Sequence, residues 1–175
     1  EKLKEFQKIA DEVIQRLKKE FKEKYEIENI QSILQVQKFL SKFEEAKFFP
    51  KTLKSNQISL KTNYLLDNFF QLRKKIKNKE LLDFIDLYYK YKLISHFKQT
   101  LLVFDKYVDS QNKIHPEFSE FKTTTGRILS QNPCIQQLPN EKTAEKKLGG
   151  IISFPEYEEI SNFKTQILKP YPNHR

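Results

Sequence analysis

The segment KIHPEFSEFKTTTGRILSQNPCIQQLP, residues 113–139, marks the point at which the chain changes from helix-forming to strand- and turn-forming sequence. It follows the turn-forming residues 109–112, and residues 114–121 alternate between apolar and polar side chains, which predicts a β-hairpin. Residues 123–140 are polar and are interrupted by one glycine and two prolines, so we expect irregular chain there.

Upstream of this segment the sequence predicts helices. Apolar residues recur at three- and four-residue intervals, glycine is absent, and charged residues fill the remaining positions. The four expected helices are residues 2–24, a helix with Ser32 as its N-cap, one that begins near Ser59 or Thr62, and residues 79–107. The predicted fold class is therefore mainly α (α+β), about four helices with a small β-hairpin.

Charge and cysteine content narrow the classes of function. The chain of 175 residues has 32 Lys and Arg against 23 Asp and Glu, a net charge of +9, which suits a partner such as DNA, RNA or an anionic membrane surface. A single cysteine, Cys134, excludes an internal disulfide and a cysteine-based metal site, and it fits a reducing compartment. No stretch is long and apolar enough to span a membrane. The chain starts at Glu1 without methionine, which indicates a removed leader or a piece of a longer product.

Residues 113–139 resemble, without a gap, the signature of family A (bacterial polymerase I-like) DNA polymerases. That signature reads R-[IV]-H-x-x-[FY]-x-Q-x-x-T-x-T-G-R-L-S-S-x-x-P-N-L-Q-N-I-P. The same or an equivalent residue stands at Ile114, His115, Phe118, Thr123, Thr125, Gly126, Arg127, Ser130, Pro133, Gln136 and Pro139.

The resemblance extends upstream in the order that the family has. Residues 31–36 resemble its N-S-x-x-Q-L motif, residues 51–59 its K-T-x-K-T-G-x-S-T turn, and residues 82–87 its L-E-Y-R-E-L helix. By this resemblance residues 1–109 form a helical thumb-like domain. Residues 110–175 form the start of a palm.

The resemblance also implies a nucleic-acid interface. The family's thumb grips the minor-groove side of a primer–template duplex, and its T-G-R segment lies along the primer end. An arginine fork can donate to minor-groove acceptors that every base pair carries, so such a contact follows duplex geometry and not sequence. The implied contact residues are Arg127, Thr123, Thr125, Gln136, Gln137, Lys90 and Lys92. The alternative is that Arg127 is a solvated turn residue.

Several positions depart from the family pattern. Cys134 and Gln137 replace family asparagines, and Glu141 replaces an arginine, which weakens two phosphate contacts and reverses the charge at a third. Further on, Phe163 aligns with the aspartate that binds both catalytic metal ions, and no Asp follows Asp109. Mg²⁺ prefers oxygen ligands and two-metal phosphoryl transfer needs carboxylates, so we expect no catalysis, no metal and no cofactor. Glu156, Glu158 and Glu159 could serve as substitutes, but a solvated acidic turn explains them better.

Three functions follow from the sequence. The first is a non-catalytic polymerase-like protein that grips duplex DNA or RNA, with no small-molecule substrate. The second is a polymerase relic that serves as a structural subunit of an organellar assembly, a mitochondrial ribosome or respiratory complex. Its aromatic clusters would then be interface anchors or simply core: Phe48–Phe49, Phe69–Phe70 and Tyr88–Tyr91. The third is a fragment of an active polymerase, against which Phe163 argues. We expect an intracellular reducing compartment, with the mitochondrial matrix or another organelle favoured over the cytosol.

Overall fold

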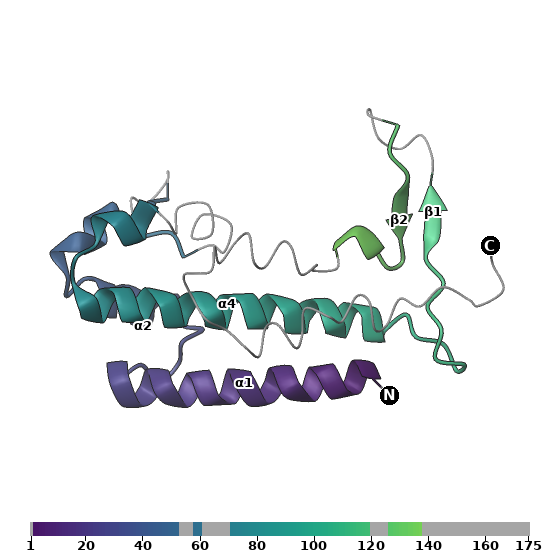
Figure 1. Cartoon of the computed structure of the whole chain (residues 1–175), viewed down its shortest axis with the longest axis horizontal. Helices are drawn as coiled ribbons and strands as arrows, with labels where there is room; N and C mark the ends of the chain where they lie inside the picture. The colour runs from purple at the N-terminus through teal and green to yellow at the C-terminus, as the bar shows by residue number, and fades with distance from the viewer. Residues whose placement is uncertain (1, 53–57, 61–70, 120–125, 138–175) are drawn as a thin grey trace. The chain divides into compact units, whose positions relative to one another are not determined.

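The computed structural model describes residues 2–52, 58–60, 71–119 and 126–137. This part of the chain is mainly α with one small antiparallel hairpin, as predicted (Figure 1). Its elements are α1 (Lys2–Tyr25), α2 (Ile33–Leu40), the 3-10 helix η1 (Glu44–Phe48), α4 (Lys79–Asp105), β1 (Glu117–Ser119), β2 (Leu129–Gln131) and the 3-10 helix η2 (Ile135–Gln137). Residues 71–75 are also helical, and most of the helix expected around them lies outside the described residues.

The chain forms two compact units. One comprises residues 12–93, and the other comprises residues 1–11 together with 94–175. No helix among the described residues is long and apolar enough to cross a membrane.

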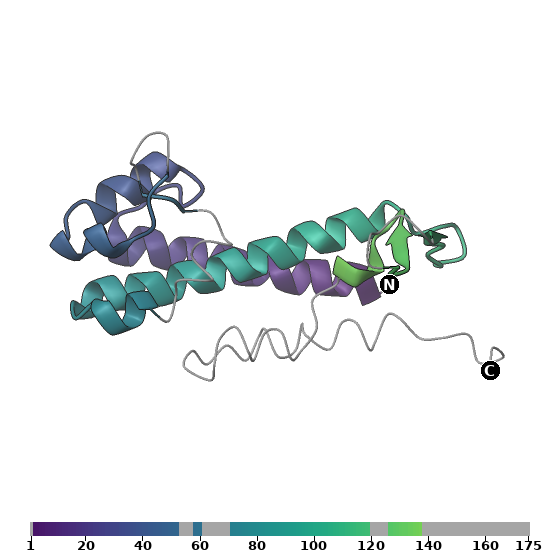
Figure 2. The same ribbon diagram turned by 90° about the horizontal axis from the view of Figure 1, so that it is seen from above.

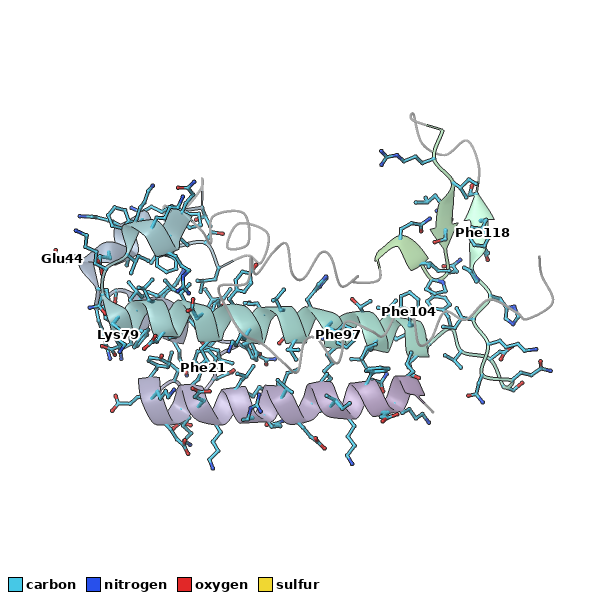
Figure 3. All side chains as sticks on the ribbon, viewed as in Figure 1. Phe21, Glu44, Lys79, Phe97, Phe104 and Phe118 are labelled. Atoms are coloured by element: carbon cyan, nitrogen blue, oxygen red, sulfur yellow. The ribbon has the colours of Figure 1, made fainter. Side chains whose placement is uncertain are left out.

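Aromatic rings form the core of the unit of residues 12–93. Phe21 of α1 lies 5.6 Å from Phe84, 6.4 Å from Tyr88 and 6.2 Å from Tyr91, all three on α4 and all edge-on, as measured between ring centroids. Phe39 of α2 lies 4.5 Å from Phe84. Within this unit the segments of α1 and α4 run side by side in both ribbon views (Figures 1 and 2), and Phe21 lies between these two helices in Figure 3. Large rings compensate here for the narrow apolar stripes of strongly charged helices.

This core corrects one interpretation of the aromatic clusters. Tyr88, Tyr89, Tyr91 and Phe49 are all buried, so they are core residues and not interface anchors. Phe48 is 38% exposed. Phe69–Phe70 lies outside the described residues.

Side-chain hydrogen bonds fix the start of α4. Glu45 of η1 accepts hydrogen bonds from the backbone N–H groups of Lys77 (2.9 Å) and Asn78 (3.3 Å). Asn78 then caps α4, since its side-chain oxygen accepts from the backbone N–H of Leu81 at 3.1 Å. The helix therefore starts where the sequence predicts, and it ends at Asp105, two residues before the predicted end.

The start of α2 differs from the prediction in one respect. Ser32 occupies the N-cap position, but its side chain makes no capping hydrogen bond. The preceding turn is held by amide side chains instead: Gln35 accepts from the backbone N–H of Asn29 at 2.8 Å, and Asn29 accepts from that of Gln31 at 3.0 Å.

In the described part of the unit that contains the chain's first residues, the second half of α4 supplies four buried apolar side chains. These are Ile94, Phe97, Leu101 and Phe104, two of which Figure 3 labels. The first residues of α1 contribute Leu3, Phe6 and Ala10. An ion pair between Lys98 of α4 and Asp11 of α1 adds a polar contact in this unit.

The hairpin in the same unit pairs β1 with β2. Phe118 stands opposite Ser130, and the last pair toward the connecting segment is Ser119 with Leu129. The expected strand region 114–121 thus contains β1, but its partner lies at residues 129–131, where irregular chain was expected. A short polar strand of this kind lacks the apolar alternation by which strands are recognised.

Candidate nucleic-acid interface

Arg127 lies on an irregular stretch immediately before β2. Gly126 precedes it with φ +66°, a left-handed conformation that side chains rarely adopt, and no other atom lies within 4 Å of the position that a Cβ would take there. Arg127 is exposed to solvent. The local chain therefore presents a guanidinium group at the end of the hairpin.

The side chain of Gln136, from η2, bonds to the backbone on both sides of Leu129. Its Nε2 donates to the carbonyl oxygen of Ile128 at 3.2 Å, and its Oε1 accepts from the backbone N–H of Ser130 at 3.3 Å. The Ser130 hydroxyl also donates to Gln136 Oε1, and it accepts from the backbone N–H of Ile135 at 2.8 Å. Ser130 is 1% exposed, so this small network fastens η2 to β2.

The turn between α4 and β1 is organised by Asp109. One carboxylate oxygen accepts from the backbone N–H groups of Gln111 and Lys113, both at 2.8 Å, and the other lies 2.8 Å from Nε2 of His115. The backbone hydrogen bond from Lys113, followed by the bond with His115, lowers the pKa of Asp109 below its ordinary value. Turn chemistry at this position was predicted, and it is confirmed.

Lys90 and Lys92 have different surroundings on α4. Lys90 lines a hollow whose charged lining comprises Glu20, Glu80, Asp83 and Asp86 as well as Lys24, Lys79 and Lys90, so the surface around it is not basic overall. Lys92 places its ammonium group 5.3 Å from the ring centre of Tyr88, and burial lowers its pKa. Two residues apart on a helix, the two lysines point to different sides.

A comparison with protein-family models identifies the chain. The model described as DNA polymerase family A matches residues 1–161 of the 175. The chain belongs to DNA polymerase family A. A search of curated proteins gave no match.

The structure brings together two of the residues that family A membership singles out. Arg127 and Gln136 lie in the same unit, and Gln136 binds the carbonyl oxygen of Ile128, the residue that directly follows Arg127. Thr123 and Thr125 lie outside the described residues, as do Glu141, Phe163 and the side chain of Gln137. Lys90 and Lys92 belong to the other unit.

Sequence reasoning missed how Ser130 and Gln136 act on each other in this family A chain. Both stand at positions that match the family signature, but a signature does not show which side chains bond within the protein. The burial of Ser130, which accompanies these bonds, is visible in the structure and not in the sequence. Among the described residues no group of three potential metal ligands occurs.

Proposed function

We propose that this family A polymerase chain is a non-catalytic protein that grips duplex nucleic acid through Arg127 and the Thr-Gly-Arg segment. The observation that carries the proposal is the exposed Arg127, which a left-handed glycine and the start of β2 flank within the region that the family model matches. The net charge of +9 supports a polyanionic partner.

The physical basis of the grip is a fork of N–H donors against the minor groove. Purine N3 and pyrimidine O2 accept hydrogen bonds in every base pair, so an arginine there holds a duplex irrespective of its sequence. Thr123 and Thr125 would add sugar and phosphate contacts. An amide carries two N–H donors, and Gln136 uses one for Ile128, so a phosphate contact from this side chain requires the second.

The two lysines on α4 contribute less to this proposal. Carboxylates share the surroundings of Lys90, and Lys92 packs over a tyrosine ring, so neither presents an isolated positive charge to phosphate. The grip therefore rests on Arg127 and its neighbours in sequence.

The non-catalytic part of the proposal rests on Phe163. A phenyl ring supplies no oxygen ligand for Mg²⁺ at the position where the family signature continues to its metal-binding aspartate. No aspartate occurs between residues 110 and 175 to replace it.

Fluorescence anisotropy of a labelled duplex, measured over a series of salt concentrations, tests the grip. We expect binding that weakens steeply with salt, and Arg127→Ala should reduce the slope of log affinity against log salt by about one unit. Arg127→Lys keeps the charge but loses the planar fork, so it should retain the slope and still lose affinity. Lys106→Ala, in the same unit, controls for the loss of one exposed charge. Equal effects of the alanine variants at 106 and 127, or no binding at low salt, would contradict the proposal.

A second candidate, a structural subunit of a larger assembly, draws on two exposed apolar residues of α2. Ile33 is 58% and Leu34 76% exposed, and adjacent large apolar side chains in water favour contact with another protein. Co-purification of the tagged chain with a defined set of organellar proteins, combined with the absence of duplex binding, would favour this function over the first.

A further inference from the structure

We propose that Gln136 is a positioning residue, which holds Arg127 in place for nucleic acid by bonding to the backbone beside it. The inference rests on the proposed function, and it assigns Gln136 a role inside the protein instead of a contact with the ligand. It starts from the amide hydrogen bonds to Ile128 and Ser130 described above.

The pairing of the two strands stops before it reaches Arg127. Leu129, the first residue of β2, pairs with Ser119, so Ile128 and Arg127 lie outside the strand pairing. Gln136 anchors the backbone at this point, because its Nε2 bonds to the carbonyl oxygen of Ile128, the residue directly after Arg127. Gly126 on the other side allows more backbone conformations than any other residue would.

The side chain of Gln136 is itself held in place by Ser130. The buried hydroxyl of Ser130 donates to Oε1 of Gln136 and accepts from the backbone N–H of Ile135, so both the side chain and the backbone of η2 are tied to β2. The Cys134 thiol lies 3.4 Å from the same Oε1. With Oε1 engaged in this way the amide has one orientation, in which Nε2 faces Ile128.

The consequence for binding is an entropic one. Fixing the backbone of a residue costs free energy, and a protein that has fixed it on folding does not incur that cost when the ligand binds. Without the Gln136 amide, the entropic cost of fixing this backbone would arise when the duplex binds. For one residue we expect the affinity for duplex to fall about tenfold.

A double-mutant cycle on duplex affinity distinguishes positioning from direct contact. If Gln136 acts through Arg127, Gln136→Leu weakens binding in the wild-type background and changes nothing further in Arg127→Ala. If Gln136 touches nucleic acid by itself, the two losses add, and the inference is wrong. Gln99→Leu, an exposed glutamine of α4 in the same unit, is the matched control and should leave affinity unchanged.

Hydrogen exchange of the Ser130 amide tests the anchor without any ligand. Gln136→Leu should accelerate the exchange of the Ser130 amide. Gln136→Glu should accelerate it less, because glutamate keeps an acceptor for Ser130 but has no donor for Ile128. Unchanged exchange in Gln136→Leu would overturn the inference, even where circular dichroism shows an intact helical fold. If Arg127→Ala leaves duplex affinity unchanged, the proposed function fails, and exchange at Ser130 alone then decides whether the anchor exists.

Discussion

Asp109 shows how one side chain sets the course of the chain between α4 and the hairpin. Its two oxygens together contact two backbone N–H groups and the ring of His115, and its own backbone N–H donates to the carbonyl of Lys113 at 2.9 Å. Asn112, in the turn, takes a φ of 59°, a left-handed value that asparagine tolerates better than most residues. The carboxylate of Asp109 and the backbone hydrogen bonds of this turn therefore together set the direction in which β1 leaves the helix.

The pH dependence of stability provides a test of this turn. The pKa of Asp109 is lower in the folded protein than its ordinary value of 3.8, so the folded state binds the proton less readily than the unfolded state. The carboxylate thus stabilises the fold above about pH 3.8, and this contribution disappears as the pH falls through the lower folded-state pKa. Asp109→Ala should lower the midpoint of thermal unfolding at neutral pH, and the difference from wild type should shrink in acid.

Asp105→Ala is the control, because it removes a carboxylate four residues earlier in the chain. If the difference in unfolding midpoint between wild type and Asp109→Ala stays constant from neutral pH to pH 2, the charge of the carboxylate does not stabilise the turn.

Sequence predicted this turn but not the bonds of Gln136, and the reason is physical. Asp109 acts on residues two and four positions away, so its role can be recognised in a local pattern. The Gln136 amide acts on residues six and eight positions away, across a strand that the sequence did not predict. Its orientation depends on the fold of that strand.

Among the elements, the helices were predicted and the partner strand was not. In the long helix α1 the apolar residues repeat at helical spacing, which is easy to recognise. In α4 apolar residues occur on several faces, and its 27 residues contain neither glycine nor proline, which favours a helix. The strand β2 has three residues, Leu129, Ser130 and Gln131, and in the part of the chain that the structure describes it pairs with β1. Strands this short are specified by their partner and by the residues around them, which no local pattern records.

The aromatic core between α1, α2 and α4 should dominate the stability of its unit. Phe84 is 1% exposed and contacts the rings of Phe21, Tyr25, Phe39 and Tyr88. Phe84→Ala should therefore lower the free energy of unfolding by about 3–5 kcal/mol, measured by urea denaturation. Phe84→Leu should cost less, because it leaves a smaller cavity.

Phe118 offers a matched comparison for that substitution. It is 66% exposed on β1, where Figure 3 labels it, so Phe118→Ala should change the free energy of unfolding by no more than about 0.5 kcal/mol. Similar losses at positions 84 and 118 would contradict the assignment of the core.

For the whole molecule, membership of DNA polymerase family A and the predicted place of Phe163 at a metal-binding position lead to opposite expectations about activity. The family model matches residues 1–161, and Phe163 follows two positions later. A chain can keep the groups that hold a duplex and lose those that hold Mg²⁺, because the two tasks use different side chains: arginine for the groove, and carboxylates for the metal.

Primer extension tests whether the chain can catalyse polymerisation. With labelled primer–template, all four deoxynucleotides and Mg²⁺, the chain should extend no primer, because Phe163 offers no oxygen to the metal. A catalytically active family A polymerase under the same conditions is the positive control. Extension by the purified chain, abolished by EDTA, would contradict the non-catalytic proposal.

The amide of Gln136 has one more consequence, for how the protein behaves in a concentrated solution. In an antiparallel pair every second residue directs its N–H and C=O away from the partner strand, which creates an edge that another strand can join. On β2 the carbonyl of Ile128 and the N–H of Ser130 are taken by a side chain that imitates such a strand. With these two groups occupied, the outer edge of β2 has fewer free backbone groups for a neighbouring strand to join.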